Sequence, residues 1–314
     1  MYTQAATFVI LGQSVYIYGL FLSVACLLAG SLLLLKTRKT TPRQKNAAAL
    51  TCLLSPMLGL FFARLVYVAA EVNFAPFLSF QNAVNLRLGG LSMYGALIGA
   101  VLGAFISARL CGLKKAEWLD VITPSLFLFI AVARLGEQYT TLGISRPLVT
   151  GVLDHTFLAV RDEFDAYLRT YLLENAAAII LCAACFVYNK KQRRAGDVFL
   201  FGALLFGASQ TLFESLRFDA HIRFSFVGLH QVLSAALFSG VLIFLAIRLI
   251  KQKTHQRLAI ISLSLILPLL GAIIGIEFMI DRSQVNKWLS YAIYAAVLLI
   301  PCCLGLSMLK RERV

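Results

Sequence analysis

Apolar residues fill nine long stretches of the chain, and short segments rich in polar residues separate them. The stretches cover residues 15–36, 47–71, 91–111, 117–136, 171–189, 197–216, 226–250, 258–280 and 286–309. A helix needs about 20 predominantly apolar residues to cross the hydrocarbon core of a bilayer. The pattern therefore predicts an all-α fold, a polytopic integral membrane helical bundle with about nine transmembrane helices.

Basic residues are concentrated in every second connection between these stretches. They are Lys36, Arg38, Lys39, Arg43 and Lys45, then Arg109, Lys114 and Lys115, then Lys190, Lys191, Arg193 and Arg194, then Arg248, Lys251, Lys253 and Arg257, and finally Lys310, Arg311 and Arg313. Short loops that carry an excess of lysine and arginine remain on the cytoplasmic side of the membrane. The alternation predicts that the N-terminus is outside and the C-terminus is in the cytoplasm, which an odd number of spans satisfies.

The composition agrees with a membrane protein, since 60% of the residues are hydrophobic and only 14% are charged. The mean hydropathy of +0.81 is too high for an ordinary soluble domain. A net charge of +14 would suit nucleic acid, but the basic residues lie in short clusters between apolar stretches. We expect no nucleic-acid partner and no removable signal peptide, so the first helix stays in the mature protein.

The longest connection covers residues 137–170, and the predicted topology places it outside the membrane. We expect a short amphipathic helix near residues 159–169. The sequence has no clear internal repeat. It predicts one membrane domain over residues 1–250, with residues 251–314 adding two transmembrane helices at the C-terminal end.

The cysteines are expected to be packing residues. Cys182 and Cys185 form a C-x-x-C pair, and Cys302 and Cys303 are adjacent, but both pairs lie in apolar stretches without a neighbouring histidine. A metal site needs ligands that converge, and buried free cysteine otherwise behaves as a small hydrophobic residue. We therefore expect neither a metal nor a cofactor.

Small residues recur at every fourth position of the third apolar stretch. They are Gly95, Gly99, Gly103, Ser107 and Cys111. Such a face lets two helices approach closely within lipid. It does not account for Gly89, Gly90 and Tyr94, which precede it at the outer end of this helix.

Several ionisable residues lie inside the apolar stretches, close to their predicted outer ends. They are Arg64 in the second stretch, Arg134 and Glu137 at the end of the fourth, and Glu214 and Arg217 at the end of the sixth. Charged groups at membrane depth are costly and usually face a protein interior or a wet cavity. The planar guanidinium group donates two parallel hydrogen bonds to a phosphate. We therefore predict a site for an anionic lipid headgroup in the outer leaflet.

The sequence resembles the prolipoprotein diacylglyceryl transferase family over about residues 10–250. The resemblance rests on motifs whose order and spacing are specific. They are Y-G-L at 18–20, R-L-V-Y at 64–67, G-G-L-S-M-Y-G-A-L-I-G at 89–99, L-D-V-I-T-P at 119–124, A-R-L-G at 133–136, R-A-G-D-V-F at 194–199, F-E-S-L-R at 213–217 and H-Q-V-L-S at 230–234.

The resemblance implies the first step of lipoprotein maturation, at the outer leaflet of the bacterial inner (plasma) membrane. The family transfers a diacylglyceryl group from phosphatidylglycerol to the thiol of the lipobox cysteine in a prolipoprotein signal peptide, and glycerol-1-phosphate leaves. Its partners are therefore phosphatidylglycerol, the lipobox peptide and the bilayer. No cofactor is implied.

The resemblance also implies roles for individual residues. Arg134 binds and polarises the phosphate, and the catalytic set consists of Arg134, Tyr94 and Glu137. The substrate-binding set consists of Tyr18, Arg64, Gly89, Gly90, Gly95, Gln210, Glu214 and Arg217. In it, Tyr18 orients the headgroup, and the glycines let the backbone approach the lipid. Asp120 supports the inner part of the fourth helix.

The chain departs from the family pattern where the chemistry is expected. Tyr94 stands in place of histidine, and a phenol with an ordinary pKa of about 10 is a weaker base near neutral pH. Glu137 stands in place of asparagine, Gln210 in place of arginine, and Phe206 in place of tyrosine. The usual N-x-E is replaced by Q-Y-T-T-L-G. Phosphatidylglycerol should therefore be held less strongly.

Two histidines and two other functions remain to be weighed. His230 is either a substitute base or an ordinary histidine at the start of a helix, and His221 is expected in an exposed loop. A catalytically altered or inactive relative that binds a phospholipid or a lipidated peptide is the main alternative to the enzyme. A transporter is less consistent with charges that gather at one end of the helices rather than at the midplane.

Overall fold

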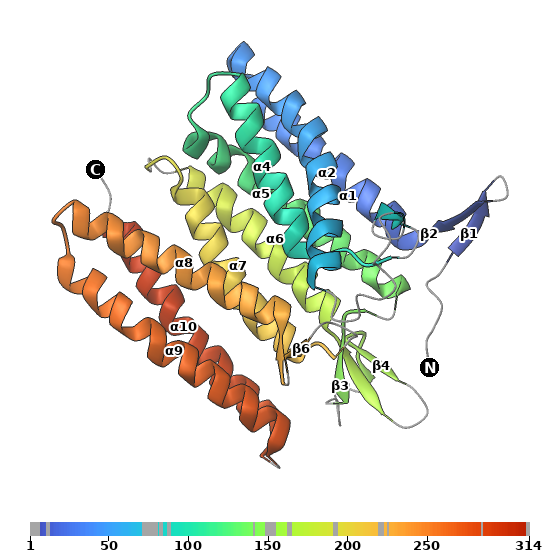
Figure 1. Ribbon diagram of the computed structural model, residues 1–314, viewed down its shortest axis with the longest axis vertical. Coiled ribbons are helices and arrows are strands. Elements are labelled where there is room, and N and C mark those ends of the chain that lie inside the picture. Colours follow the sequence, from blue (N-terminus) through green and yellow to red (C-terminus); the bar gives the residue numbers. More distant parts are fainter. Residues whose placement is uncertain are drawn as a thin grey trace. The chain divides into compact units, whose positions relative to one another are not determined.

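The computed structural model describes residues 7–10, 13–70, 81, 84–86, 89–140, 142–147, 155–161, 165–190, 194–218, 223–224, 226–283 and 285–311. In these residues, nine helices are long and apolar enough to cross a membrane, which confirms the predicted bundle (Figure 1). The chain forms two compact units. Unit 1 comprises Met1–Ala25 and Phe127–Val314, and unit 2 comprises Cys26–Leu126.

The membrane-length helices follow the predicted apolar stretches closely. They are α1 (Ile17–Thr37), α2 (Pro42–Ala70), α4 (Met93–Leu110), α5 (Lys115–Leu135), α6 (Thr170–Asn189), α7 (Asp197–Leu216), α8 (Leu229–Lys251), α9 (Gln256–Arg282) and α10 (Lys287–Arg311). A short 3-10 helix, η3 (Gly136–Tyr139), continues α5.

Unit 2 is built around the close packing of α2 against α4. A Cβ atom at Gly103 would lie 2.8 Å from the backbone of Ser55, and one at Gly99 would overlap the carbonyl group of Leu58. The Ser55 hydroxyl donates to the Ala100 carbonyl at 2.8 Å. The small-residue face therefore packs helix backbone against helix backbone, as the four-residue spacing predicted.

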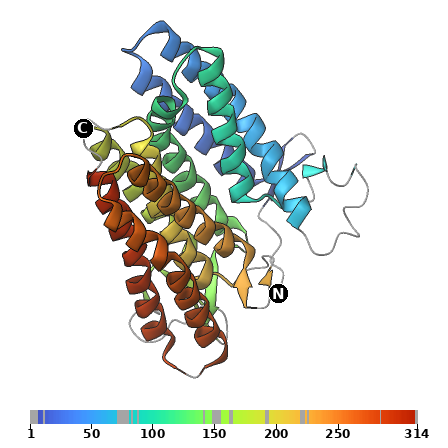
Figure 2. The same cartoon turned by 60° about the vertical axis from the view of Figure 1, so that its left-hand side comes forward.

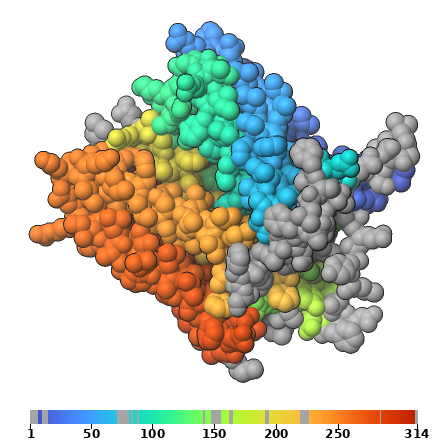
Figure 3. All heavy atoms as spheres, viewed as in Figure 1, coloured from blue at the N-terminus to red at the C-terminus, as the bar shows by residue number. Residues whose placement is uncertain are grey.

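Unit 1 places α9 and α10 against α7 and α8 (Figures 1 and 2). Side by side, α8 and α9 cross one face of this unit (Figure 3). A Cβ atom at Gly207 of α7 would lie 2.9 Å from the Phe238 nitrogen of α8, so this glycine permits close contact. Helices α9 and α10 belong to the same compact unit as α7 and α8. The domain boundary proposed at residue 250 stays a prediction.

An ion pair joins the start of α7 to the end of α8. Asp197 begins α7, and its carboxylate accepts a hydrogen bond from Arg248, in the last turn of α8, at 2.7 Å. A carboxylate in the first turn also suits the positive end of a helix dipole. The R-A-G-D-V-F motif therefore has a structural role at the far end of α7 from Glu214.

Part of the connection between α5 and α6 folds as a small antiparallel sheet. Its strands are β3 (Ile144–Pro147), β4 (Ala159–Arg161) and β5 (Ala166–Arg169), in the order β3-β5-β4. The amphipathic helix predicted near residues 159–169 is therefore wrong. Burial in β5 alternates, with Ala166 and Leu168 buried and Tyr167 and Arg169 partly exposed, which is the period of a strand.

Two-residue and four-residue strands form the other described hairpins. Strand β1 (Thr7–Ile10) pairs with β2 (Gln13–Tyr16) immediately before α1, and β6 (Arg223–Phe224) pairs with β7 (Val227–Gly228) immediately before α8. Both hairpins lie at the helix ends where the ionisable residues gather. His221, which was expected to be exposed, lies outside the described residues.

Candidate functional site

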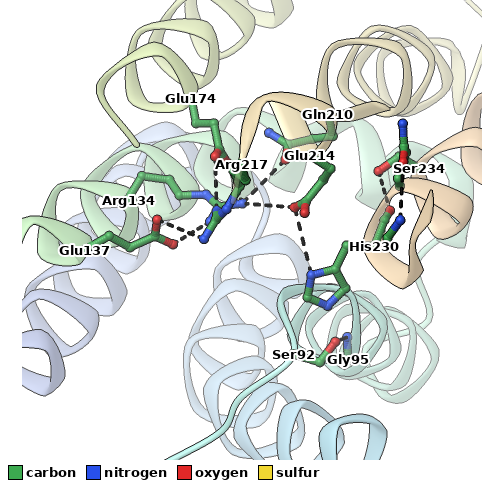
Figure 4. Close-up of polar contacts among 12 residues, drawn as sticks. Ser92, Gly95, Arg134, Glu137, Glu174, Gln210, Glu214, Arg217, His230 and Ser234 are labelled. Carbon is green, nitrogen blue, oxygen red and sulfur yellow. Dashed lines mark hydrogen bonds and ion pairs between the residues drawn. The ribbon is translucent and has the colours of Figure 1, made fainter. Parts of the chain in front are cut away.

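Five charged side chains meet at one end of the helices of unit 1 (Figure 4). They are Arg134 in the last turn of α5, Glu137 in η3, Glu174 near the start of α6, Glu214 near the end of α7, and Arg217 directly after α7. All five are buried, and Glu174 is fully so. We call this set the ion cluster.

Arg134 is the centre of the ion cluster. Its Nη1 atom lies 2.5 Å from Glu137 Oε1, and its Nη2 atom lies 2.5 Å from Glu174 Oε2. Nη2 is also 4.0 Å from Glu214 Oε1 and donates a longer hydrogen bond, of 3.4 Å, to Gln210 Oε1. The guanidinium group thus faces side chains from α6, α7 and η3 at once.

Arg217 shares two of these carboxylates. Its Nη1 atom lies 3.0 Å from Glu174 Oε1, and its Nη2 atom lies 3.3 Å from Glu137 Oε2. Glu137 and Glu174 therefore each bridge both arginines (Figure 4). With His230 neutral and all three acidic side chains ionised, three carboxylates against two guanidinium groups give the cluster one net negative charge. In that state, an incoming anion would have to replace a carboxylate.

Glycines allow the backbone around Arg134 to adopt the required path. Gly143 has a φ of +73°, in the left-handed region, and a Cβ atom there would lie 2.5 Å from Glu137 Oε2. A Cβ atom at Gly136 would lie 2.7 Å from Phe21 and 3.0 Å from the ring of Tyr18. Gly136 thus lets the first turn of α1, with Tyr18, pack against the segment that carries Arg134 and Glu137.

Backbone hydrogen bonds fix the segment that carries Arg217. The Arg217 nitrogen donates to the Phe213 carbonyl at 3.0 Å, which ends α7. Arg217 also forms a bridge with Ser145, and the Phe218 nitrogen donates to the Ile144 carbonyl at 2.9 Å. Strand β3 therefore pairs with the segment that directly follows α7, and this pairing restricts where the guanidinium group of Arg217 can lie.

His230 lies at the edge of the ion cluster, in the first turn of α8. Its Nδ1 atom is 3.9 Å from Glu214 Oε1, and its side chain is only 14% exposed. A carboxylate beside an imidazole can orient the ring. The structure thus brings His230 to the same carboxylate that approaches Arg134.

The remaining predicted site residues lie in unit 2. Arg64 donates to the carbonyl groups of Gly89 and Gly90, and its guanidinium group lies 5.7 Å from the ring centre of Tyr67. Both glycines have positive φ values, of 71° and 76°, which few other residues adopt. The Arg64 contacts therefore stabilise the glycine segment, and a role in lipid binding stays a prediction.

Tyr94 is buried in the first turn of α4. Ser92 caps this helix, because its hydroxyl accepts a hydrogen bond from the Gly95 nitrogen at 3.4 Å. A Cβ atom at Gly95 would overlap the Phe62 carbonyl of α2, so Gly95 is a packing glycine. Asp120 is also buried, on α5, where the carbonyl of the next residue, Val121, accepts from Lys36 at 2.9 Å.

Sequence reasoning missed two residues of this site. Glu174 is a lone carboxylate in an otherwise apolar stretch, Y-L-L-E-N-A-A-A, and that isolation was the available signal. Gly143 ends the stretch Q-Y-T-T-L-G, which departs from the family pattern and gave no signal for this contact. In the described parts of the chain, no group of three or more histidine, cysteine or acidic side chains is arranged to hold a metal ion.

Residues 5–251 match the family model described as Prolipoprotein diacylglyceryl transferase. The chain belongs to this family. A relative from Bacillus mycoides is 27% identical over 246 residues, which cover 74% of this chain and 88% of that protein. A relative from Bacillus cereus gives the same values. A relative from Chloroflexus aggregans is 33% identical over 133 residues, which cover 41% of this chain and 42% of that protein.

All three relatives are named phosphatidylglycerol–prolipoprotein diacylglyceryl transferase. The family match ends at residue 251, where α8 ends, so α9 and α10 lie beyond it. The ion cluster of this member of the prolipoprotein diacylglyceryl transferase family lies wholly inside the matched region. The two additional helices lie in the same compact unit as that cluster.

Proposed function

We propose that the chain transfers a diacylglyceryl group from phosphatidylglycerol to the lipobox cysteine of prolipoproteins. The family match over residues 5–251 carries this proposal, and the buried Arg134–Arg217 pair supports it. The reaction takes place at the outer leaflet of the bacterial inner membrane. The N-terminus is outside and the C-terminus is in the cytoplasm, so the ion cluster lies at the outer ends of its helices.

The reaction replaces a carbon–oxygen bond by a carbon–sulfur bond. The cysteine thiol loses its proton, because the thiolate is the nucleophile. Sulfur then bonds to the carbon of the diacylglycerol moiety that carries the phosphate in phosphatidylglycerol. The bond from that carbon to the phosphate oxygen breaks, and glycerol-1-phosphate leaves with the electron pair. Negative charge grows on the phosphate as it departs, so a cation aimed at the phosphate accelerates the step.

Arg134 supplies that cation, and Arg217 and Tyr18 complete the polar shell. Arg134 already holds two carboxylate oxygens at 2.5 Å, and in this proposal the phosphate displaces one of them. Glu137 is the carboxylate to be displaced, because it belongs to a short 3-10 segment rather than to a long helix. Glu174, on α6, then keeps both guanidinium groups in place.

The proton of the thiol needs an acceptor near the cluster. Tyr94 occupies the position where the family resemblance implies a histidine, but a phenolate is not available near neutral pH without help. His230 is a second candidate, since its ring lies 3.9 Å from Glu214 in the same unit as Arg134. An imidazole has the right ordinary pKa for this role.

A relative that binds a phospholipid or a lipidated peptide without turnover is the second candidate function. The charge count of the ion cluster favours it, since Glu137 adds a carboxylate and Gln210 removes a cation relative to the family pattern. A transporter has no such specific support.

Rescue of a bacterial strain depleted of its own transferase tests the proposed function. We expect growth with the wild-type chain and none with Arg134→Ala. Lys114→Ala is the control, because Lys114 is exposed directly before α5 and should rescue normally. Failure of the wild type, expressed in the membrane with phosphatidylglycerol still copurifying, would favour the binding protein. Equal rescue by Arg134→Ala would contradict the role of the cluster.

A further inference from the structure

A buried polar contact joins α9 and α10 to the start of α8. The amide nitrogen of Gln231 lies 2.5 Å from Glu277 Oε1 of α9 and 2.8 Å from the hydroxyl of Tyr294 on α10. The amide oxygen of Gln231 accepts from the Gly228 nitrogen at 3.4 Å and so caps α8. Gln231 is the residue directly after His230.

A second contact joins α10 to the end of α7. The hydroxyl of Tyr291 donates to the Ser215 carbonyl at 3.2 Å, in a buried position. Carbonyl groups in the last turn of a helix have no partner within the helix, and lipid offers none. Tyr291 thus satisfies the α7 terminus between Glu214 and Arg217, the two cluster residues that α7 and its cap provide.

A third contact joins α9 to strand β3. Both Nη atoms of Arg146 lie 3.3 Å from Asp281 Oδ1, and the guanidinium group of Arg146 lies 5.1 Å from the ring centre of Phe218. Arg146 follows Ser145, which bridges to Arg217, and Phe218 directly follows Arg217. This ion pair therefore supports the backbone of Arg217 from the side of α9.

All three contacts come from one end of the α9–α10 hairpin, between residues 277 and 294. Each reaches a residue next to a member of the site: Gln231 beside His230, Ser215 beside Glu214, and Arg146 in the strand paired with Arg217. Packing alone does not require a carboxylate, two phenols and an ion pair at this end, because apolar side chains could be buried there equally well. Buried polar groups at membrane depth are expensive and usually have a function.

We propose that this end of the α9–α10 hairpin is a positioning device for the ion cluster. Glu277, Asp281, Tyr291 and Tyr294 act as positioning residues. They hold the end of α7, the start of α8 and strand β3 so that Arg217, Glu214 and His230 face the departing phosphate and the thiol. The inference rests on the proposed function, and it assigns a task to the two helices beyond the family match.

Steady-state transfer by the purified full chain tests the inference. Rates are measured with a lipobox peptide at saturation and phosphatidylglycerol varied, and they are normalised to the folded fraction from a thermal unfolding curve. Tyr291→Phe removes one oxygen atom and Glu277→Gln removes one charge. We expect kcat to fall about fivefold for Tyr291→Phe, the factor that corresponds to one hydrogen bond, with KM for the lipid nearly unchanged.

Tyr188→Phe is the matched control. Tyr188 stacks on Phe201 near the far end of α6 from Glu174, so its hydroxyl lies away from the cluster. We expect its kcat to equal that of the wild type. A purely structural role would lower the melting temperature of Tyr291→Phe and leave kcat per folded molecule unchanged, and that result would overturn the inference.

A charge exchange provides a second arm at residues that are less buried than Glu277 and Tyr291. The side chains of Arg146 and Asp281 are 13% and 29% exposed, so their replacement is better tolerated. Arg146→Asp and Asp281→Arg should each lower kcat, and the double variant should recover it. Lack of recovery, or normal kcat in both single variants, would contradict the inference. Absence of product from the wild type would contradict the proposed function and the inference together.

Discussion

At the scale of single residues, the unusual property of this site is its internal charge balance. Arg134 and Arg217 face Glu137, Glu174 and Glu214 inside a membrane-spanning unit, and both arginines are already bridged by carboxylates. Removing one partner from a buried ionic group leaves an uncompensated charge, whereas the group as a whole is tolerated. The identity of each cluster residue should therefore affect lipid binding and stability in different ways.

Replacement of Glu137 by asparagine should tighten the binding of phosphatidylglycerol. The change removes the carboxylate that competes with the phosphate for Arg134 and leaves two carboxylates against two guanidinium groups. We expect KM for phosphatidylglycerol to fall by about tenfold or more, since a hydrogen bond to a charged group contributes about 1.5 kcal/mol or more. The exposed pair Lys114–Glu117 provides the control variant, Glu117→Asn. A KM that stays constant or rises would show that Glu137 does not occupy the phosphate position.

Replacement of Arg217 by glutamine should destabilise the fold. Arg217 is 2% exposed, and its loss would leave three carboxylates around Arg134. Breaking a buried ionic group in this way costs about 3–5 kcal/mol in the free energy of unfolding. Thermal unfolding in detergent measures the loss, with Lys114→Gln at an exposed position as control.

The double variant Arg217→Gln with Glu174→Gln separates charge from packing. It restores the net charge of the wild-type cluster, so part of the lost stability should return. Additive losses in the two single variants would indicate that the two residues do not interact, contrary to their 3.0 Å contact.

At the scale of elements, glycine spacing and helix ends determine how the site is supported. The α2–α4 contact in unit 2 depends on small residues, and the α7 and α8 termini in unit 1 depend on polar partners from α9, α10 and β3. The two devices differ because the first needs the absence of side chains, and the second needs donors and acceptors at defined positions.

Gly99→Ala tests the first device. The added methyl group would overlap the Leu58 carbonyl and lie 2.7 Å from the Gly59 nitrogen, so the backbones of α2 and α4 would have to move apart. Overpacking of this kind costs about 1–3 kcal/mol. Gly240→Ala is the control, because no atom of the described chain lies within 4 Å of its Cβ position and alanine favours a helix. Equal melting temperatures for the two variants would contradict the packing argument.

The type of each element was predictable wherever one physical effect was dominant. Long apolar stretches gave the nine helices, because membrane length and backbone hydrogen bonding leave few alternatives. The segment near residues 159–169 was misassigned, since its few apolar residues fit a strand as well as a short helix. Pairing with β3 and β4 decided the outcome, and a single sequence carries no information on that pairing.

The candidate site was predictable in part for a related reason. Arg134, Glu137, Glu214 and Arg217 could be placed at the same end of the bundle by counting spans. Glu174 could not be assigned to them, because its partners depend on how α6 turns its faces within unit 1. The contacts of Gln231 with Glu277 and Tyr294 could not be anticipated either, since they join residues more than 40 positions apart.

At the scale of the whole molecule, the orientation in the membrane is the prediction on which the location of the chemistry depends. The basic connections predict an external N-terminus and a cytoplasmic C-terminus. A reporter enzyme that is active only in the cytoplasm, fused after residue 311, should be active, and the same reporter fused after residue 218 should be inactive. The reverse pattern would place the ion cluster at the cytoplasmic leaflet and exclude transfer to an exported prolipoprotein.

The central claim is that a guanidinium group held in the ion cluster drives diacylglyceryl transfer. The most direct measurement supplies the purified chain with labelled phosphatidylglycerol and a lipobox peptide, and quantifies both the thioether peptide and the released glycerol-1-phosphate. We predict equal amounts of both products from the wild type and a rate about 100-fold lower from Arg134→Lys, because lysine cannot donate the paired hydrogen bonds. No thioether from the wild type, or an unchanged rate from Arg134→Lys, would contradict the claim.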